Sequence, residues 1–431
     1  MTTRTRIAPS PTGDPHVGTA YIALFNYCFA KKNGGSFVLR IEDTDQERSH
    51  PSYEKGIIDA LQWLGIQWDE GPGAGGEFGP YRQSERKAIY TEKARELVDK
   101  NEAYHCFCSG ERLQALRKDQ MARKENPGYD RLCRGLSKEE VEERLARGEA
   151  HVIRLKMPKE GDTIIHDRLR GDISYPNYQQ DEQILIKSDG FPTYHLANVV
   201  DDHLMKITHV IRAEEWIPST PKHIRLYEAF GWERPEFIHM PLLRNKDKSK
   251  ISKRKNPVSL DYYKKIGILP ETMINFLALL GHSLGDDKEM FSLDELLAEF
   301  DLSRVSLGEP VFNLEKLEWL NGMYLRAMTP EVLAEKLMEN AFHKDHLSQI
   351  APLIQERILK FDEFLSKADF FFKGLIDFPI ETAVGKKMTP KETRLVLEGL
   401  TEELDRLTEW TDEKIEQTIR AWGDRNELHA R

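Results

Sequence analysis

Cysteine is scarce in this sequence: the chain has four in 431 residues, too few for the disulfide framework of a secreted domain. No apolar run approaches the roughly 18 residues that a membrane-spanning helix needs, and the N-terminus shows no apolar segment with a cleavage site. Basic residues are not in excess, because the formal net charge is −10. These absences predict a soluble, cytoplasmic protein without a membrane partner, and they still allow a local basic face.

Repeats and low-complexity tracts are also absent, so the length sets the next expectation. A chain of 431 residues suggests two to four domains, because one domain usually takes about 100–200 residues. Hydrophobic residues make up 39% of the chain, which is enough to build packed cores.

The stretch Arg6–Thr19 contains the first sign of a ligand site. A short strand is predicted at its start, and three prolines keep the following backbone extended. Asp14 suits a helix N-cap and Pro15 the first helical position, so we expect a helix over about 15–32 that stops at Asn33–Gly35.

The first turn of that helix is a candidate phosphate site. His16 and Thr19 lie where backbone N–H groups and the helix dipole attract anions, and Gly18 leaves no side chain in the way. An ordinary strand–helix turn is the alternative, and these residues alone do not exclude it.

Acidic residues follow the next predicted strand, Ser36–Ile41. Strand, helix and strand form a parallel unit, and ligands bind at the carboxyl ends of such strands. Glu42 is nearest to that end and is the candidate partner of a substrate ammonium group. Asp43 and Asp45 fit a functional role and the capping of the next helix, 53–64, equally well.

Three of the four cysteines lie close together in sequence, which predicts a metal site. Cys106, Cys108 and Cys133 would be thiolate ligands of Zn²⁺, with Tyr129, His105 or water as the fourth ligand. Three unrelated reduced cysteines remain the alternative, because Cys-x-Cys is tighter than the usual ligand spacing. The fourth cysteine, Cys28, lies in the middle of the first predicted helix and is expected to be a small residue of the hydrophobic core.

The middle of the chain alternates strands and helices. A helix over 194–203 would place Tyr194 and Asn198 on one face, and we interpret His195 and His203 as packing residues rather than metal ligands. Strands are expected at 152–156, 171–175, 183–186, 207–212 and 237–243, with a polar turn between the first two.

A basic run, Arg244–Lys255, follows the last of these strands. Such a run is usually a solvated surface, but its place after a strand of a nucleotide-type domain favours a phosphate-binding loop. Beyond Asn256 the pattern is helical, and 329–431 is typical of a helical bundle.

Together these motifs resemble a class I aminoacyl-tRNA synthetase, specifically the bacterial-type glutamyl-tRNA synthetases. His16–Thr19 is similar to the family's HIGH signature and Lys250–Arg254 to its KMSKS signature. The resemblance implies an α/β Rossmann-type catalytic domain with an inserted α+β acceptor-binding domain, followed by an all-α C-terminal half. The implied catalytic halves are 1–88 and 194–245, and the insertion between them is 89–193. A stem-contact domain would follow at 246–328 and an anticodon-binding region at 329–431.

The resemblance also implies residue roles. The glutamate site would comprise Arg6, Tyr194 and Arg212 for the side-chain carboxylate, Ala8, Ser10 and Asn198 as pocket contacts, and Glu42 for the α-ammonium. The ATP site would comprise His16, Gly18, Thr19, Glu215, Leu243 and Lys253, with His16, Lys250 and Lys253 as catalytic groups. The set Cys106, Cys108, Tyr129 and Cys133 resembles a zinc site found in some members.

The implied activity is ATP-dependent attachment of glutamate to tRNA(Glu), with Mg²⁺ assisting, by a monomeric enzyme that needs tRNA for activation. The alternatives are the shortened paralogue that modifies a tRNA base, a glutaminyl enzyme, and a non-catalytic RNA-binding relative. Arg357, on an expected helix over 350–365, is either an anticodon contact or a solvated surface residue. Members of the family generally extend beyond residue 431, so we expect the distal anticodon-binding part to be absent and tRNA affinity to be weaker.

Overall fold

The computed structural model describes residues 2–251, 257–285, 288–373, 380–385, 388–426 and 428, and it divides into two units, 1–349 and 350–431. The strands are β1 (Arg4–Ile7), β2 (Ser36–Leu39), β3 (Ala103–Cys106), β4 (Val152–Leu155), β5 (Asp162–Asp167), β6 (Gly171–Pro176), β7 (Ile184–Ile186), β8 (His209–Ala213) and β9 (Glu236–Met240). The helices of the first part are α1 (Val17–Lys32), α2 (Pro51–Trp63), α3 (Lys87–Asp99), α4 (Gly110–Ala122), α5 (Lys138–Ala146), α6 (Tyr194–Leu204) and α7 (Thr220–Phe230). The later helices are α8 (Leu260–Lys265), α9 (Pro270–Gly281), α10 (Leu293–Glu299), α11 (Leu314–Ala327), α12 (Pro330–Asn340), α13 (Lys344–Ile354), α14 (Glu363–Ala368), α15 (Ile380–Ala383), α16 (Pro390–Leu404) and α17 (Asp412–Arg425).

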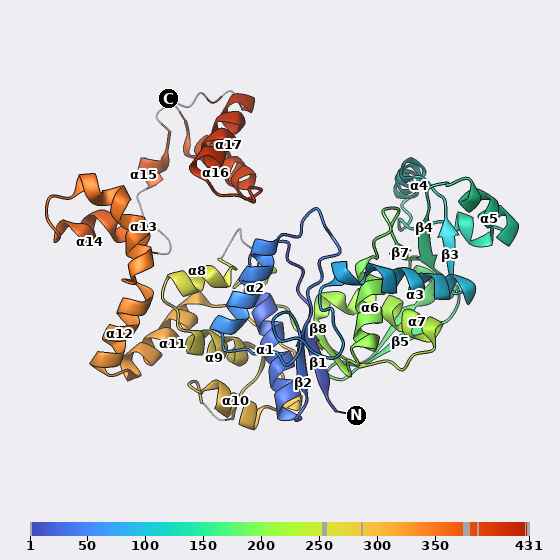
Figure 1. Cartoon of the computed structure of the whole chain (residues 1–431), viewed down its shortest axis with the longest axis horizontal. Coiled ribbons are helices and arrows are strands. Elements are labelled where there is room, and N and C mark those ends of the chain that lie inside the picture. Colours follow the sequence, from blue (N-terminus) through green and yellow to red (C-terminus); the bar gives the residue numbers. More distant parts are fainter. Residues whose placement is uncertain are drawn as a thin grey trace. The chain divides into compact units, whose positions relative to one another are not determined.

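The first unit begins with the predicted strand–helix–strand arrangement. β1 and β2 pair in parallel with Arg4 opposite Ser36, and α1 runs beside both strands (Figure 1). Next to β1 lies the start of β8, because the Thr208 backbone N–H donates to the Arg4 carbonyl at 3.0 Å. The carboxyl ends of these strands therefore meet near the N-terminus of α1.

The start of α1 differs from the prediction. Asp14 is not the N-cap: His16 is, and its Nδ1 accepts a hydrogen bond from the Gly18 backbone N–H at 2.9 Å. The Val17 N–H donates to the Val258 carbonyl at 2.8 Å, so a distant segment holds the chain before Val17 extended. This tertiary pairing overrides the local capping preference of Asp14.

A four-stranded sheet with the order β6-β5-β9-β8 is the second large structural feature of the first unit. β8 and β9 are parallel, and β5 and β6 form an antiparallel hairpin beside β9. The expected polar turn between the strands at 152–156 and 171–175 is wrong over residues 162–167, which form β5. Only two of its six side chains are buried, so its sequence lacks the apolar pattern of a strand, and pairing with β6 and β9 stabilises it.

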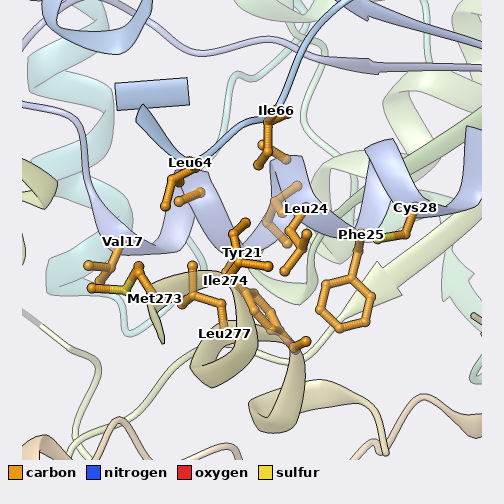
Figure 2. Close-up of a cluster of buried hydrophobic side chains, with 14 of the residues drawn as sticks. Val17, Tyr21, Leu24, Phe25, Cys28, Leu64, Ile66, Met273, Ile274 and Leu277 are labelled. Carbon is orange, nitrogen blue, oxygen red and sulfur yellow. The ribbon is translucent and has the colours of Figure 1, made fainter. Parts of the chain in front are cut away.

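The core joins α1 to α9 across a layer of buried apolar side chains, shown in Figure 2. Tyr21 and Phe25 of α1 approach the end of α9 so closely that a Cβ added at Gly281 would lie 2.9 Å from Phe25 Cζ. Cys28 is fully buried in this layer, as predicted, and burial raises the pKa of its thiol.

Among the residues described, no strand follows Met240, which agrees with the predicted helical C-terminal half. No described helix is both long and apolar enough to cross a membrane. In the second unit Ile350, Ile354 and Ala368 form a small core. The single helix expected over 350–365 is wrong: α13 ends at Ile354, two residues after Pro352, which cannot donate within a helix. Arg357 lies instead in an exposed 3₁₀ turn, η6 (Gln355–Arg357).

Candidate active site

A cavity of about 370 Å³ lies where the carboxyl ends of β1 and β8 meet the start of α1. Residues from two segments far apart in the sequence, 6–42 and 194–251, line it. Every candidate for the glutamate and ATP sites that the structure describes is among them, namely Arg6, Ala8, Ser10, His16, Gly18, Thr19, Glu42, Tyr194, Asn198, Arg212, Glu215, Leu243 and Lys250. Lys253 lies outside the described residues.

The N-terminus of α1 presents His16 to this cavity. Because its Nδ1 accepts from the Gly18 N–H, the neutral ring carries its hydrogen on Nε2. A Cβ at Gly18 would lie 3.1 Å from His16 Nδ1 and would crowd the ring. Gly18 therefore preserves the position of the imidazole, and the helix terminus adds a positive potential for an anion.

Two residues of opposite charge in the cavity lining form an ion pair with each other. Lys250 Nζ forms an ion pair with Glu215, which belongs to the 3₁₀ turn η4 (Glu214–Ser219) after β8. Lys250 is 58% exposed and Glu215 is 41% exposed, so the pair is well solvated. Solvated pairs are weak, and an incoming ligand can replace either partner at small cost.

Behind the cavity lies a fully buried set of charges centred on Arg40. Its guanidinium pairs with Glu42 at 3.0 Å and with Asp202 at 2.7 Å, and Asp202 also binds Arg6 Nε at 3.0 Å. Burial alone would lower the pKa of Arg40, but Asp202 and Glu42 raise it well above its ordinary value. Arg6, a predicted substrate contact, is thus already paired with a carboxylate.

Glu42 has a different balance of charge. Arg40 and the Asn198 amide donate to the same oxygen, Oε1, at 3.0 and 3.1 Å. Burial nevertheless raises the pKa of Glu42 above its usual value, although Arg40 and Asn198 act to lower it. A further cation in the cavity would stabilise this carboxylate, as the expected ammonium group would.

Arg212 is the exception among the buried arginines. It is 5% exposed, and among the described residues no carboxylate oxygen lies within 4.0 Å of its nitrogens. Its NH1 donates to the Tyr194 hydroxyl at 3.4 Å. Burial, together with the charge of Arg6, lowers the pKa of Arg212 below its usual value. A buried cation without an anionic partner is costly, so the site is organised to receive an anion.

The sequence analysis missed several residues that build this site. They are Arg40 and Asp202 in the charge cluster, and Thr220, His223 and His239 around Arg212. One available signal was a polar residue inside an apolar strand, since Arg40 and His239 interrupt such runs. Thr220 and His223 gave no such signal, because their helix brings them to the site only in the folded chain.

Other candidates have structural partners. His195 contacts His223 at 3.0 Å and the ring of His203 stacks on Trp232 at 3.8 Å, which are packing and hydrogen-bonding contacts of the kind that the sequence favoured. Asp43 accepts from Ser84 N and Oγ, at 2.8 and 2.6 Å. Asp45 binds Arg48, and neither acidic residue lines the cavity. Neither caps the next helix, α2, because its N-cap is His50.

The cysteine cluster is a second site, at the end of the antiparallel sheet β3-β4-β7. The sulfur atoms of Cys106, Cys108 and Cys133 all lie within 4.8 Å of one another, with Cys108 and Cys133 3.6 Å apart. Tetrahedral thiolates at a Zn–S distance of about 2.3 Å would be about 3.8 Å apart. The arrangement therefore fits zinc.

The fourth corner of this cluster is a phenol. Tyr129 Oη lies 3.3 Å from Cys106 Sγ and 3.6 Å from Cys108 Sγ, and it accepts from the Cys133 backbone N–H at 3.0 Å. His105 precedes Cys106 on β3, so its side chain projects from the opposite face, where it packs on His151. Of the three fourth ligands that the sequence left open, Tyr129 has the position and His105 does not.

The fold and the cavity define the class of protein. The sequence model described as tRNA synthetases class I (E and Q), catalytic domain, matches residues 2–319, and an anticodon binding domain matches residues 328–431. The chain belongs to this family of class I tRNA synthetases, as the resemblance of its motifs predicted.

Two curated relatives and two solved structures place it more closely. The glutamate–tRNA ligases of Pseudomonas entomophila and Pseudomonas aeruginosa are each 54% identical over 430 residues, covering 100% of this chain and 87% of theirs. A glutamate tRNA ligase from Elizabethkingia meningosepticum, crystallised in complex with its amino acid, is 38% identical with a TM-score of 0.75. The glutamate-tRNA synthetase of Elizabethkingia anophelis is 36% identical with the same TM-score. Both matches cover 100% of this chain and 91% of the solved chain.

Proposed function

We propose that the chain is a glutamate–tRNA ligase, which activates L-glutamate with ATP to glutamyl-adenylate and transfers the glutamyl group to the 3′ end of tRNA(Glu). The observation that carries the substrate choice is Arg212, a buried guanidinium in the cavity whose partners among the described residues are all neutral. The side-chain carboxylate of glutamate would complete its coordination. The side-chain NH₂ group of glutamine is a hydrogen-bond donor and would face the donors of the Arg212 guanidinium, so glutamine would be rejected.

The remaining residues of the cavity suit the two ends of the reaction. Glu42, with Asn198 beside it, would hold the α-ammonium of glutamate. The substrate α-carboxylate is already ionised, so the reaction needs in-line positioning and charge stabilisation rather than a strong protein base. His16 at the helix terminus and Lys250 would meet the charge that develops on the ATP phosphates, with Mg²⁺ sharing that load. The same role for Lys253 remains a prediction from the sequence.

We also propose the finer domain assignment: Rossmann halves at 1–88 and 194–245, an acceptor-stem insertion at 89–193, a stem-contact domain at 246–328 and an anticodon-binding region at 329–431. The hairpin β5–β6 lies within 89–193 but pairs with β9, so this part of the interval belongs to the sheet of the second Rossmann half rather than to the insertion. The separate antiparallel sheet β3-β4-β7 supports the insertion. The exposure of Arg357 is compatible with an anticodon contact. A monomeric, cytoplasmic enzyme remains our expectation.

Zinc would be a structural metal of the insertion, held by Cys106, Cys108, Cys133 and the Tyr129 phenol. We expect one zinc per chain in protein purified without chelators. Cys133→Ser should release it and lower the melting temperature of the insertion while the catalytic region stays folded. Elemental analysis of both proteins checks this, and wild-type protein without zinc would contradict it.

The activity is tested by charging tRNA(Glu) with labelled glutamate or glutamine, and by ATP–pyrophosphate exchange with and without tRNA. We expect charging at the tRNA 3′ end with glutamate, exchange that depends on tRNA, and strong discrimination against glutamine. Transfer to an internal base would support the paralogue, and efficient use of glutamine would support the glutaminyl enzyme. Absence of both activities in folded protein would support the non-catalytic relative.

A further inference from the structure

Three neutral acceptors surround the Arg212 guanidinium on the side away from the cavity. Its Nε donates to His239 Nε2 at 3.2 Å, its NH1 to His223 Nδ1 at 3.1 Å, and its NH2 to the Thr220 hydroxyl at 2.8 Å. His239 and Thr220 are completely buried and His223 is 1% exposed. We call these three residues the acceptor cradle of Arg212.

Each member of the cradle is held as an acceptor by a partner further out. Because arginine only donates, His223 must carry its hydrogen on Nε2, which lies 3.0 Å from His195 Nδ1. His239 must carry its hydrogen on Nδ1, which lies 2.6 Å from an Asp167 oxygen.

The third member is oriented in the same way. The Thr220 hydroxyl donates its hydrogen to the Trp216 carbonyl at 3.0 Å, which leaves its lone pairs for Arg212. The outer partners thus orient all three acceptors toward one cation.

The cradle carries no charge of its own. Burial, followed by the nearby Arg212, lowers the pKa of His223 well below its usual value. Burial also lowers the pKa of His239, against the opposing effect of Asp167. Asp167 contacts His239, and the imidazole of His239 separates this carboxylate from Arg212.

We propose that Thr220, His223 and His239 are positioning residues that fix Arg212 through neutral acceptors, so that its charge is kept for the side-chain carboxylate of the substrate. The inference rests on the proposed role of Arg212. A carboxylate in the cradle would hold the guanidinium equally well, but it would neutralise it and compete with the substrate. Selection for glutamate over glutamine then depends on residues that do not touch the substrate.

A matched pair of variants at His223 tests the proposal in the full chain with tRNA(Glu) present. His223→Asp places a carboxylate beside Arg212, whereas His223→Asn places a neutral amide oxygen where Nδ1 lies. We expect His223→Asp to raise the KM for glutamate about 10- to 100-fold, the range of one charge-assisted hydrogen bond. The KM for ATP should change little. The loss with His223→Asn should be at least about tenfold smaller, because the acceptor is kept.

A control variant separates charge at the cradle from charge elsewhere on the same helix pair. His203→Asp on α6 also converts a histidine to a carboxylate, but His203 packs on Trp232 and does not line the cavity. It should leave the KM for glutamate and the preference over glutamine unchanged. An equal effect of His203→Asp and His223→Asp would overturn the proposal.

Thr220 provides a second pair that does not depend on the folding of His223→Asp. Thr220→Val removes the acceptor and keeps the shape, whereas Thr220→Ser keeps the hydroxyl. Thr220→Val should raise the KM for glutamate about threefold to tenfold, and Thr220→Ser should do so less. Equal KM values for Thr220→Val, Thr220→Ser and wild type would contradict the cradle.

Arg212→Leu distinguishes failure of this inference from failure of the proposed function. If Arg212→Leu leaves the KM for glutamate unchanged, the proposed role of Arg212 is wrong. If Arg212→Leu raises it while folded His223→Asp and Thr220→Val do not, only the cradle is wrong.

Discussion

Arg40 and Arg212 are both buried arginines of the same catalytic region, yet their surroundings are opposite. Arg40 is 0% exposed and forms ion pairs with Glu42 and Asp202. Arg212 is 5% exposed and bonds only to neutral groups of the protein among the residues described. The paired arginine has a raised pKa, whereas burial lowers the pKa of the other.

The comparison shows how a buried charge reveals its role. A guanidinium whose charge is neutralised by carboxylates of the fold holds elements together, here β2 and α6. A guanidinium surrounded by neutral acceptors is kept in place but not neutralised, so its counter-ion must come from outside. Burial alone would not have separated the two.

The largest expected effect on stability is that of Arg40→Met. Besides Glu42 and Asp202, Arg40 pairs with Asp201, whose Oδ2 lies 3.8 Å from its Nε. Removing this central cation leaves three buried carboxylates with fewer partners, which should lower the free energy of unfolding by about 3–5 kcal/mol. Denaturant unfolding of the catalytic region measures it. The double variant Arg40→Met/Glu42→Gln removes one carboxylate as well and should be less destabilised, and a double variant no better than the single one would argue against the charge balance.

Arg212→Leu should invert this pattern. Glutamate binding should weaken by about 2–5 kcal/mol, because the buried substrate carboxylate loses its cation. Stability should change by less than about 2 kcal/mol, because the loss of an unneutralised buried charge offsets the acceptors left unpaired. Glutamate-dependent kinetics and a melting curve of the same preparation check both expectations. Strong destabilisation with intact glutamate binding would make Arg212 equivalent to Arg40.

Acid should lower the folding stability of the protein through His195, which contacts His223 of the acceptor cradle. Burial, then the charges of Lys222 and Arg212, lowers the pKa of His195 to about 3, against about 6.5 in the unfolded chain. The unfolded state then binds more protons between these values. The contribution to stability is complete above about pH 6.5 and is lost as the pH falls toward 3, by up to about 1.4 kcal/mol per pH unit.

His195→Asn removes this titration. Its melting temperature should therefore fall less steeply than that of wild type when the pH is lowered from about 6.5 to about 5. Parallel melting profiles of the two proteins would show that His195 is not held neutral. A slope that differs only below about pH 4 would point to carboxylates instead.

The smallest effect on stability is expected at the solvated pair of the cavity. Lys250→Ala breaks an ion pair between residues that are 58% and 41% exposed, so the melting temperature should stay nearly unchanged. The rate of adenylate formation should nevertheless fall about tenfold or more, because Lys250 is proposed to meet phosphate charge. A stability loss without a loss of rate would assign Lys250 to the structural group.

Several features of this protein follow from local sequence alone. The helix after the HIGH-like motif stops before Gly34, whose φ of +61° suits glycine, and the strand–helix–strand unit follows from its spacing. The motif residues that line the cavity could be named because the resemblance supplied their roles. The cysteine spacing predicted that Cys106, Cys108 and Cys133 lie together and left the fourth ligand of the proposed zinc site open.

Tertiary structure alone decided the rest. Pairing with residues far along the chain moved the start of α1 past Asp14, and pairing with β6 along its length and with β9 at Asp167 made β5 a strand where a polar turn was expected. Neither the ion pairs of Arg40 nor the neutral neighbours of Arg212 are visible in the sequence, where both are single arginines in apolar runs. The charge balance depends on distances between residues up to 162 positions apart, such as Arg40 and Asp202, and folding sets those distances.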